Sequence, residues 1–167
     1  HETRNVWAQV KGSKYPDSIL IIGAHFDHLG MMGDVQYPGA NDNASGTAML
    51  LELARHFSQK ENQTECTLVF AAFSGEEAGL MGSRYMARHF PYNLKKVRLM
   101  INLDMVATGS EGVTVVNANA FPKLFQDLVD LNEQKHYLKE VKARGESCNS
   151  DHCPFYEEGV PAIFIYT

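Results

Sequence analysis

Nearly continuous apolar runs, each about the length of a β-strand, constrain the fold of this chain more than any other feature. CTLVFAAF (66–73) and VRLMINLDMVA (97–107) are such runs, and VPAIFIYT (160–167) is a third. Runs of this kind are typical of strands that are covered on both faces. Segments with helical periodicity separate them, near 44–57, 79–90 and 121–134. The sequence therefore predicts an α/β fold, a three-layer αβα domain around a mixed, mostly parallel sheet.

The N-terminal part is expected to add an antiparallel edge to this sheet. NVWAQVKG (5–12) and SILIIGAHFDH (18–28) are β-rich, and the KYPDS turn between them predicts a hairpin-like pair. At 167 residues, the whole chain (1–167) is predicted to be one domain.

Charge and hydropathy argue against two classes of partner. The formal net charge is -5 and the basic residues are thinly spread, so no nucleic-acid partner is expected. No apolar stretch approaches the roughly 18 to 20 residues that a membrane span requires. The sequence carries no signal for an oligomeric state.

Polar side chains gather where the predicted strands end. His25 ends one strand, Glu76 and Glu77 follow another, Asp104 interrupts a third, and Asp42 opens the first long helix. The carboxyl ends of strands in an open α/β sheet meet at one edge, where ligands bind. Carboxylates crowded there would repel one another without a counter-charge. Imidazole nitrogen and carboxylate oxygen suit zinc, and two ions about 3.5 to 4 Å apart can share a carboxylate, so a zinc site is predicted.

The sequence around His25 and Asp104 strengthens the prediction that these two residues are metal ligands. A histidine such as His25 at a strand end is commonly an ordinary loop residue. Asp27, two residues later, points to the same side of the strand, and its carboxylate is expected to accept the second ring N–H of His25. Asp104 lies inside the apolar run MINLDMVA, where an unpaired carboxylate is costly.

The other acidic residues have simpler explanations that stay open. Asp42 can cap the helix that is expected to start near Ala44. Glu76 and Glu77 can be first-turn acids that interact favourably with a helix dipole.

Motifs in five segments occur in order along nearly the whole chain: GAHFDHLG, GANDNASGTAMLLELAR, FAAFSGEEAGLMGSRYM, INLDMVA and SDHCPFYEEGVPAIFIYT. Together they resemble the motifs of the co-catalytic zinc aminopeptidase family. That family includes bacterial leucine aminopeptidases, glutamate carboxypeptidase II and glutaminyl cyclase, and also the non-catalytic transferrin receptor ectodomain. The resemblance implies a zinc exopeptidase type of fold. It also implies a metallo-aminopeptidase that hydrolyses the N-terminal peptide bond of a peptide substrate.

The resemblance implies a role for each site residue. His25 and Asp104 would bind one zinc ion, Glu77 would bind the other, and Asp42 would bridge the two. Glu76 would be the general base, which takes a proton from the attacking water and later delivers it to the leaving amine.

Three alternatives compete with this interpretation. A glutaminyl-cyclase-like acyltransferase would use the same fold with one zinc ion. A catalytically silent binding module would normally have lost ligands that this chain keeps. A serine nucleophile is disfavoured, because Ser74 has no evident base partner and FSGEE lacks the G-x-S-x-G pattern.

The remaining ligand of the second ion has two candidates. Considered alone, the sequence nominates His152 in SDHCPF. The resemblance instead places that ligand in a Tyr-His pair beyond 160–167, so the chain is expected to be a catalytic domain truncated at its C-terminus. Asp151 and His152 would then support the ligands or face the substrate, or His152 would be exposed in a loop. About one tightly bound zinc ion is expected in this chain, against two in the complete enzyme.

The cysteines give an expectation about the cellular compartment of the protein. Cys148 and Cys153 lie close together in a polar loop and can pair if the surroundings are oxidising, whereas Cys66 starts an apolar run and is expected to pack as a small hydrophobic residue. A secreted or periplasmic location is the expectation.

Overall fold

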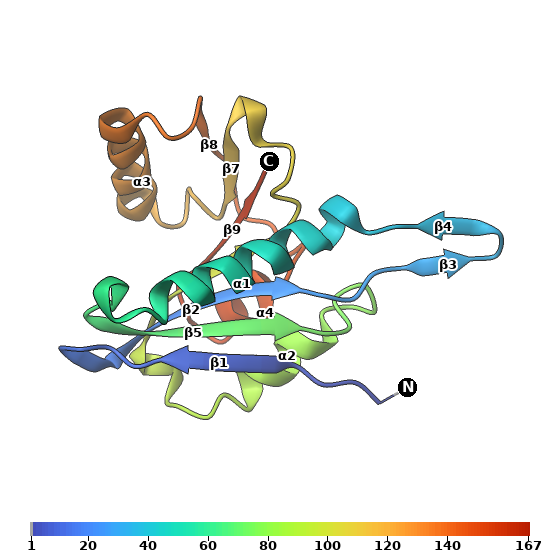
Figure 1. Ribbon diagram of the computed structural model, residues 1–167, viewed down its shortest axis with the longest axis horizontal. Coiled ribbons are helices and arrows are strands. Elements are labelled where there is room, and N and C mark those ends of the chain that lie inside the picture. Colours follow the sequence, from blue (N-terminus) through green and yellow to red (C-terminus); the bar gives the residue numbers. More distant parts are fainter. Residues whose placement is uncertain (1) are drawn as a thin grey trace.

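The computed structural model describes residues 2–167 and contains a seven-stranded sheet with helices on both faces (Figure 1). The strands of this sheet are β1 (Val6–Val10), β2 (Tyr15–His25), β5 (Cys66–Phe73), β6 (Val97–Leu103), β7 (Val113–Val116), β8 (Val141–Ala143) and β9 (Ala162–Tyr166). The helices are α1 (Gly46–Phe57), α2 (Met81–Arg88), α3 (Pro122–Lys135) and α4 (His152–Glu157).

The sheet is mixed and mostly parallel, as predicted. Its order is β1-β5-β2-β6-β9-β7-β8. The strands β5, β2, β6 and β9 run parallel, β1 is antiparallel to β5, and β7 is antiparallel to β9 and parallel to β8. The carboxyl ends of the four central strands therefore lie at one edge of the sheet.

The predicted hairpin between β1 and β2 is wrong, although β1 does form an antiparallel edge. β5 lies between the two strands and pairs with both of them. The reason is burial: Ile21 is 0% exposed and Ile22 is 8% exposed, so β2 needs cover on both faces and a central position. β1 is mostly exposed and suits the edge.

The alternating side chains of β2 join two separate cores, one on each face of the sheet. Ile19 and Ile21 belong to the core that includes residues of α2 and α4. Ile22 and Ala24 belong to the core beneath α1, and α3 packs on the same side through residues shared with that core. These contacts confirm the predicted three-layer arrangement.

Three elements were missing from the sequence prediction: β8, α4 and a separate hairpin. The hairpin consists of β3 (Gly30–Met32) and β4 (Val35–Tyr37), and it projects from the end of β2 (Figure 1). Within residues 2–167, the structure contains no helix with the length and apolar character to span a membrane.

Candidate metal centre

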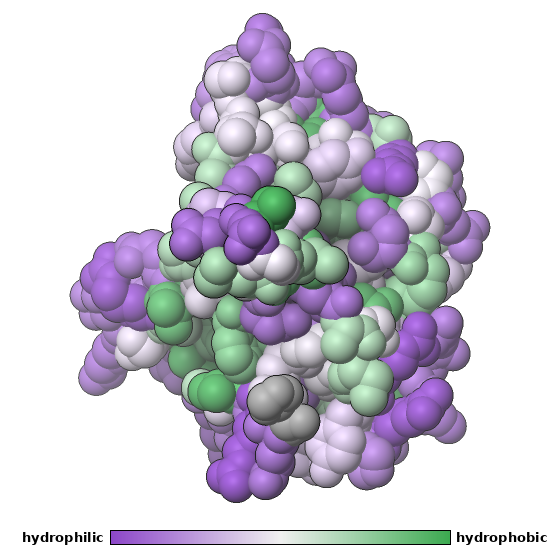
Figure 2. Space-filling model, turned by 90° about the vertical axis from the view of Figure 1, so that its right-hand side faces the viewer, coloured by the Kyte–Doolittle hydropathy of each residue, from purple (hydrophilic) through white to green (hydrophobic). Residues whose placement is uncertain are grey.

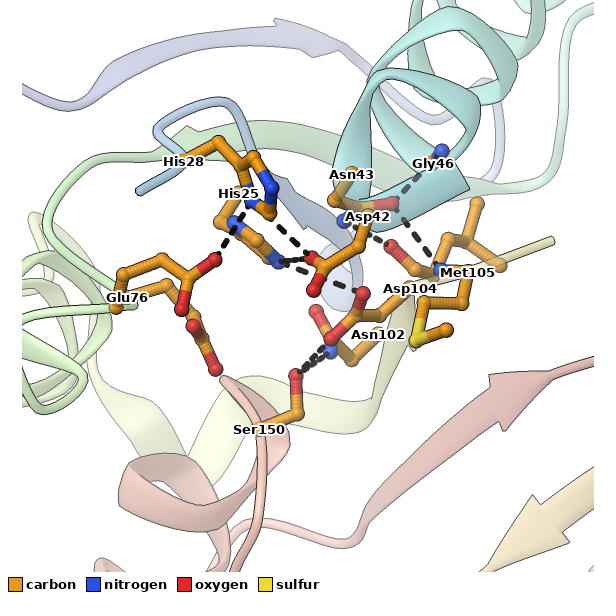
Figure 3. A network of polar contacts seen from close by, with 12 residues as sticks. His25, His28, Asp42, Asn43, Gly46, Glu76, Asn102, Asp104, Met105 and Ser150 are labelled. Atoms are coloured by element: carbon orange, nitrogen blue, oxygen red, sulfur yellow. Dashed lines mark hydrogen bonds and ion pairs between the residues drawn. The ribbon is translucent and has the colours of Figure 1, made fainter. Parts of the chain in front are cut away.

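The predicted metal ligands and Glu76 meet at the carboxyl edge of the central strands (Figure 3). His25 is the last residue of β2, and Asp104 directly follows β6. Glu76 and Glu77 lie in the loop after β5, and Asp42 lies in the Ala40–Ser45 turn that precedes α1. β2 lies between β5 and β6, so parallel strand order alone brings these loops together.

His25, Asp42 and Asp104 form a first cluster of donor atoms. The Nε2 atom of His25 lies 3.3 Å from Oδ1 of Asp42 and 3.4 Å from Oδ1 of Asp104. Tetrahedral zinc with bonds of about 2.0 to 2.1 Å separates its ligand atoms by roughly 3.3 Å. The spacing of this cluster therefore fits zinc.

Asp27 supports the cluster in a way that differs from the prediction. The Nδ1 atom of His25 lies 3.1 Å from the backbone oxygen of Asp27, whereas the Asp27 carboxylate is 3.8 Å away. The carboxylate instead accepts hydrogen bonds from the backbone N–H groups of Glu76 (3.0 Å) and Glu77 (3.2 Å). Asp27 thus links the loop that carries His25 to the loop that carries both glutamates.

Asp104 is oriented by a short chain of buried hydrogen bonds. Asn102 donates to Oγ of Ser150 over 2.8 Å, and Ser150 donates to Oδ2 of Asp104 over 2.7 Å. The other carboxylate oxygen, Oδ1, is left free to face His25. Sequence reasoning did not identify Asn102 and Ser150, because neither residue type is a strong signal by itself.

The turn that holds Asp42 is fixed by its neighbour Asn43, which is 2% exposed. The Asn43 side chain donates to the backbone oxygen of Leu103 (3.0 Å) and accepts from the backbone N–H groups of Gly46 (2.9 Å) and Met105 (3.2 Å). A Cβ atom at Gly46 would lie 2.2 Å from the Leu103 oxygen, so this close approach requires glycine.

The alternative that Asp42 caps the first helix is wrong. α1 begins at Gly46 rather than near Ala44, and no side-chain cap hydrogen bond precedes it. Asp42 has non-helical backbone angles (φ -104°, ψ 96°), and its carboxylate faces His25 and His28.

A second cluster contains a residue that the sequence analysis missed, His28. Donor atoms of His28, Asp42 and Glu77 all lie within 4.8 Å of one another. Glu76 instead approaches the first cluster, and its carboxylate comes within 4.8 Å of donor atoms of His25 and Asp104. The signal for His28 was present in the sequence, because it lies three residues after His25 in the segment HFDH.

Asp151 and His152 are both 0% exposed, so the alternative that His152 is exposed in a loop is wrong. The Nε2 atom of His152 lies 2.7 Å from the backbone oxygen of Ser147, and its ring packs on Phe164. His152 belongs to neither of the two clusters in the described chain. Its burial at the start of α4 holds a segment whose Ser150 contacts Asp104.

The site concentrates negative charge that a cation would balance. Within residues 2–167, the ion pairs of its carboxylates involve only His25 and His28. Burial raises the pKa of Glu76 to about 7 against the charge of His25. Burial also raises the pKa of Asp151 to about 7. Burial disfavours the charged ring of His25, yet contact with Asp104 and the surrounding negative charges raise its pKa to about 9.

Several buried donor and acceptor atoms of the site have no hydrogen-bond partner. They are Nε2 of His25, Nδ1 of His28, Oδ1 of Asp104 and both carboxylate oxygens of Asp151. Unpaired buried polar atoms are rare in proteins and call for an explanation such as an ion. The residues present therefore fit a divalent metal, and the mixture of imidazole and carboxylate fits zinc.

Figure 2 looks onto this end of the molecule, where hydrophilic and hydrophobic residues lie side by side around the projecting hairpin. The exposed apolar side chains of the hairpin include Met31 (63%), Met32 (58%) and Val35 (56%). The segment between His28 and Asp42 thus carries exposed apolar side chains.

Fold and site together define an α/β domain with a cluster of candidate metal ligands at the carboxyl edge of its sheet. The family model described as "Peptidase family M28" matches residues 5–167, and the chain belongs to this family. Aminopeptidase YwaD of Bacillus subtilis is 33% identical over 170 residues, which cover 93% of this chain and 33% of that protein. A probable zinc metalloprotease of Pyricularia oryzae is 40% identical over 113 residues, 65% of this chain and 22% of its own length.

Solved structures give the same result for the fold. BSAP, a zinc aminopeptidase from Bacillus subtilis, superposes with a TM-score of 0.79 at 27% identity, over 97% of this chain and 39% of that one. An aminopeptidase from Aneurinibacillus sp. strain AM-1 gives 0.80 at 32% identity, over 97% and 38%. A glutaminyl cyclase from an Acidobacteriales bacterium gives 0.83 at 23% identity, over 98% and 58%, which shows a shared fold.

Proposed function

We propose that this chain is the metal-binding catalytic domain of a zinc aminopeptidase that releases the N-terminal residue of peptides. The convergence of His25, Asp42 and Asp104 at zinc-ligand spacing, beside Glu76 and Glu77, carries the proposal. The named aminopeptidases among the relatives support the reaction class. The chain spans 33% of YwaD, so the activity proposed is that of the full-length protein.

His25, Asp42 and Asp104 would hold one zinc ion, and Glu77 would hold a second ion that shares Asp42. Zinc, when bound, supplies Lewis acidity that polarises the scissile carbonyl and lowers the pKa of water toward about 7. Three protein ligands leave a fourth zinc position open in catalytic sites. Glu76 borders the first cluster, beyond its three ligands, so its carboxylate is placed to take the proton of the attacking water.

The test is a substrate panel on the full-length protein. Release of free amino acids from aminoacyl p-nitroanilides, lost with a chelator and restored by zinc, is the expected result. Cyclisation of an N-terminal glutamine without amino-acid release would instead assign a glutaminyl-cyclase-like reaction. A full-length protein that binds no zinc would contradict both and favour a binding module.

We also propose a secreted or periplasmic location for this domain. The support is a disulfide between Cys148 and Cys153, whose Cα atoms are 4.9 Å apart, because disulfides persist in oxidising compartments. Their sequence separation is 5, and the enclosed segment includes Ser150, Asp151 and His152.

Removing this bridge should destabilise the domain. Closing so short a loop stabilises the folded state by about 2 kcal/mol in the chain-entropy model, so Cys148→Ser should lower the free energy of unfolding by about that amount. Urea unfolding measures this change, with Cys66→Ser as the matched control. Alkylation of the unfolded wild-type protein without reductant should modify Cys66 alone, and three alkylated cysteines would contradict both the bridge and the proposed compartment.

A further inference from the structure

We propose that a basic cleft at the amino edge of the sheet, where β2 and β6 begin, binds a small ligand that carries phosphate. The cleft is lined by the segment 14–18 and by Lys95, Lys96 and Arg98, and its volume is about 460 Å³. That volume lies in the range of small-molecule sites. Ser18 and His25 are seven residues apart on β2, so the cleft lies roughly 23 Å from the metal centre, at the end of β2 opposite the projecting hairpin (Figure 1). The inference is therefore independent of the proposed peptidase activity.

Two irregularities in strand register open the sheet at this cleft. Between Tyr15 and Ile19 the register of β2 against β5 shifts, because residues 16–18 of β2 have no counterpart on β5. Between Ile19 and Leu20 the register of β2 against β6 shifts by one residue, and Arg98 is the extra residue on β6. Bulges of this kind redirect side chains and are frequent at sheet edges and beside functional sites. Both bulges supply residues that line the cleft.

The walls of the cleft are held in place by hydrogen bonds. The hydroxyl of Thr67, which is 3% exposed, donates to the backbone oxygen of Pro16 over 2.8 Å and accepts from the backbone N–H of Gly12 over 3.0 Å. On the other wall, the side chain of Asn93 accepts from the backbone N–H of Lys95 over 2.9 Å. A ligand would therefore meet a cleft whose backbone is already ordered, which reduces the entropic cost of binding.

The fold gathers basic residues that are scattered along the sequence. Lys96 pairs with Asp17 at 2.8 Å, and Lys14 pairs with Glu65 at 3.4 Å. The hydrogen bond and charge of Lys96 lower the pKa of Asp17, and the nearby charge of Lys11 adds a smaller effect. Five of the 15 lysine and arginine side chains of a chain with net charge -5 thus lie in or beside the cleft.

The charge left over after these pairs indicates the chemistry of the ligand. Across residues 2–167, Lys11, Lys95 and Arg98 take part in no ion pair, so three positive charges are uncompensated. A guanidinium group presents a fork of N–H donors that matches phosphate, and lysines add point charges. Tyr15 and Ser18 line the same cleft and carry hydroxyl donors. A ligand with more than one negative charge fits this set.

The simpler alternative is that these side chains are ordinary solvated surface charges. Such charges need no cleft and no bulged strands. Here the register shifts and the hydrogen bonds of Thr67 shape one wall, and Arg98 reaches the cleft because it is the extra residue of its strand. The combination of shape and unpaired charge favours a binding site.

Calorimetric titration of the full-length protein with fructose 1,6-bisphosphate, a small molecule with two phosphate groups, tests the proposal. Wild type should bind the probe, and Arg98→Gln should bind it about 10-fold or more weakly, because a charge-assisted hydrogen bond is lost. Lys135→Gln, at an exposed position in the last turn of α3, removes one positive charge elsewhere and should bind as wild type does. A wild type that does not bind, or equal affinities in wild type and Arg98→Gln, would overturn the inference. Equal losses in the two variants would also overturn it, because binding would then reflect overall charge.

Two sources of phosphate share this chemistry, a soluble phosphorylated molecule and a phospholipid headgroup. Co-sedimentation with phosphatidylcholine vesicles, with and without phosphatidic acid, separates them. Binding only to vesicles with phosphatidic acid, lost in Arg98→Gln, would assign the headgroup, and binding of the bisphosphate alone would assign a soluble ligand. Hydrolysis of an aminoacyl p-nitroanilide should be equal in wild type and Arg98→Gln, because Arg98 lies at the opposite edge of the sheet from the metal centre. A protein that binds the bisphosphate but hydrolyses no such substrate would contradict the proposed function and leave this inference supported.

Discussion

Replacing Glu76 by glutamine should lower kcat by about 100-fold to 10,000-fold and leave zinc content nearly unchanged. Glutamine keeps the size of the side chain but cannot accept a proton. The three residues proposed to hold the first ion are untouched, and the backbone N–H of residue 76 still donates to Asp27. The measurement pairs steady-state hydrolysis of an aminoacyl p-nitroanilide with zinc content on the same preparation of the full-length protein.

The adjacent variant, Glu77→Gln, is the matched control for this prediction. Glu77 contributes to the second cluster, so its loss should remove zinc from the second site as well as reduce activity. If Glu76→Gln loses zinc and Glu77→Gln keeps it, the two glutamates have been assigned the wrong roles. Thermal unfolding of the metal-free variants shows whether either change alters the fold itself.

The sequence was sufficient to predict the layers and the edge where the site lies. Apolar runs such as 66–73 identify strands that are buried on both faces, and helical periodicity identifies the helices that cover them. The order of the strands could not be predicted in the same way, because it depends on which strand edges pair in three dimensions. β1 and β2 are neighbours in the sequence, yet β5 lies between them.

Within the site, it was easier to predict which residues take part than which atoms each of them contacts. His25, Asp42 and Asp104 came together as expected, because the ends of β2 and β6 and the turn before α1 meet at one edge of the sheet. The role of Asp27 could not be predicted, because its backbone oxygen and its carboxylate both lie within reach of different loops.

The same limit applies to His28, which the sequence analysis missed, and to His152, whose role it left open. His28 depends on the projecting hairpin and on the close approach of Gly39, neither of which has a strong sequence signal. The motif SDHCPF suggests that His152 is a metal ligand. The structure instead buries His152 at the start of α4, away from both clusters.

Removing Asp42 should affect both ions, whereas removing Asp104 should affect only one. Asp42 is the one residue that approaches both histidines, 3.3 Å from His25 and 4.0 Å from His28, within the described chain. Its side chain is 39% exposed and accepts no hydrogen bond there that the fold depends on, so Asp42→Asn should leave the metal-free domain folded. Zinc affinity should fall by about 100-fold or more at both sites, and activity should be lost with it.

Asp104→Asn is the matched comparison for Asp42→Asn. It removes one carboxylate from the first cluster alone, so one zinc ion should remain, bound through Asp42 and Glu77. Asp34→Asn, at an exposed position at the tip of the hairpin, controls for the loss of one negative charge outside the two clusters and should keep both ions. Titration of the metal-free proteins with cobalt(II), followed by visible absorption, resolves the two binding steps. If Asp42→Asn and Asp104→Asn show two separate binding steps with the same losses of cobalt affinity, Asp42 serves only one ion. Loss of a shared ligand must weaken both binding steps.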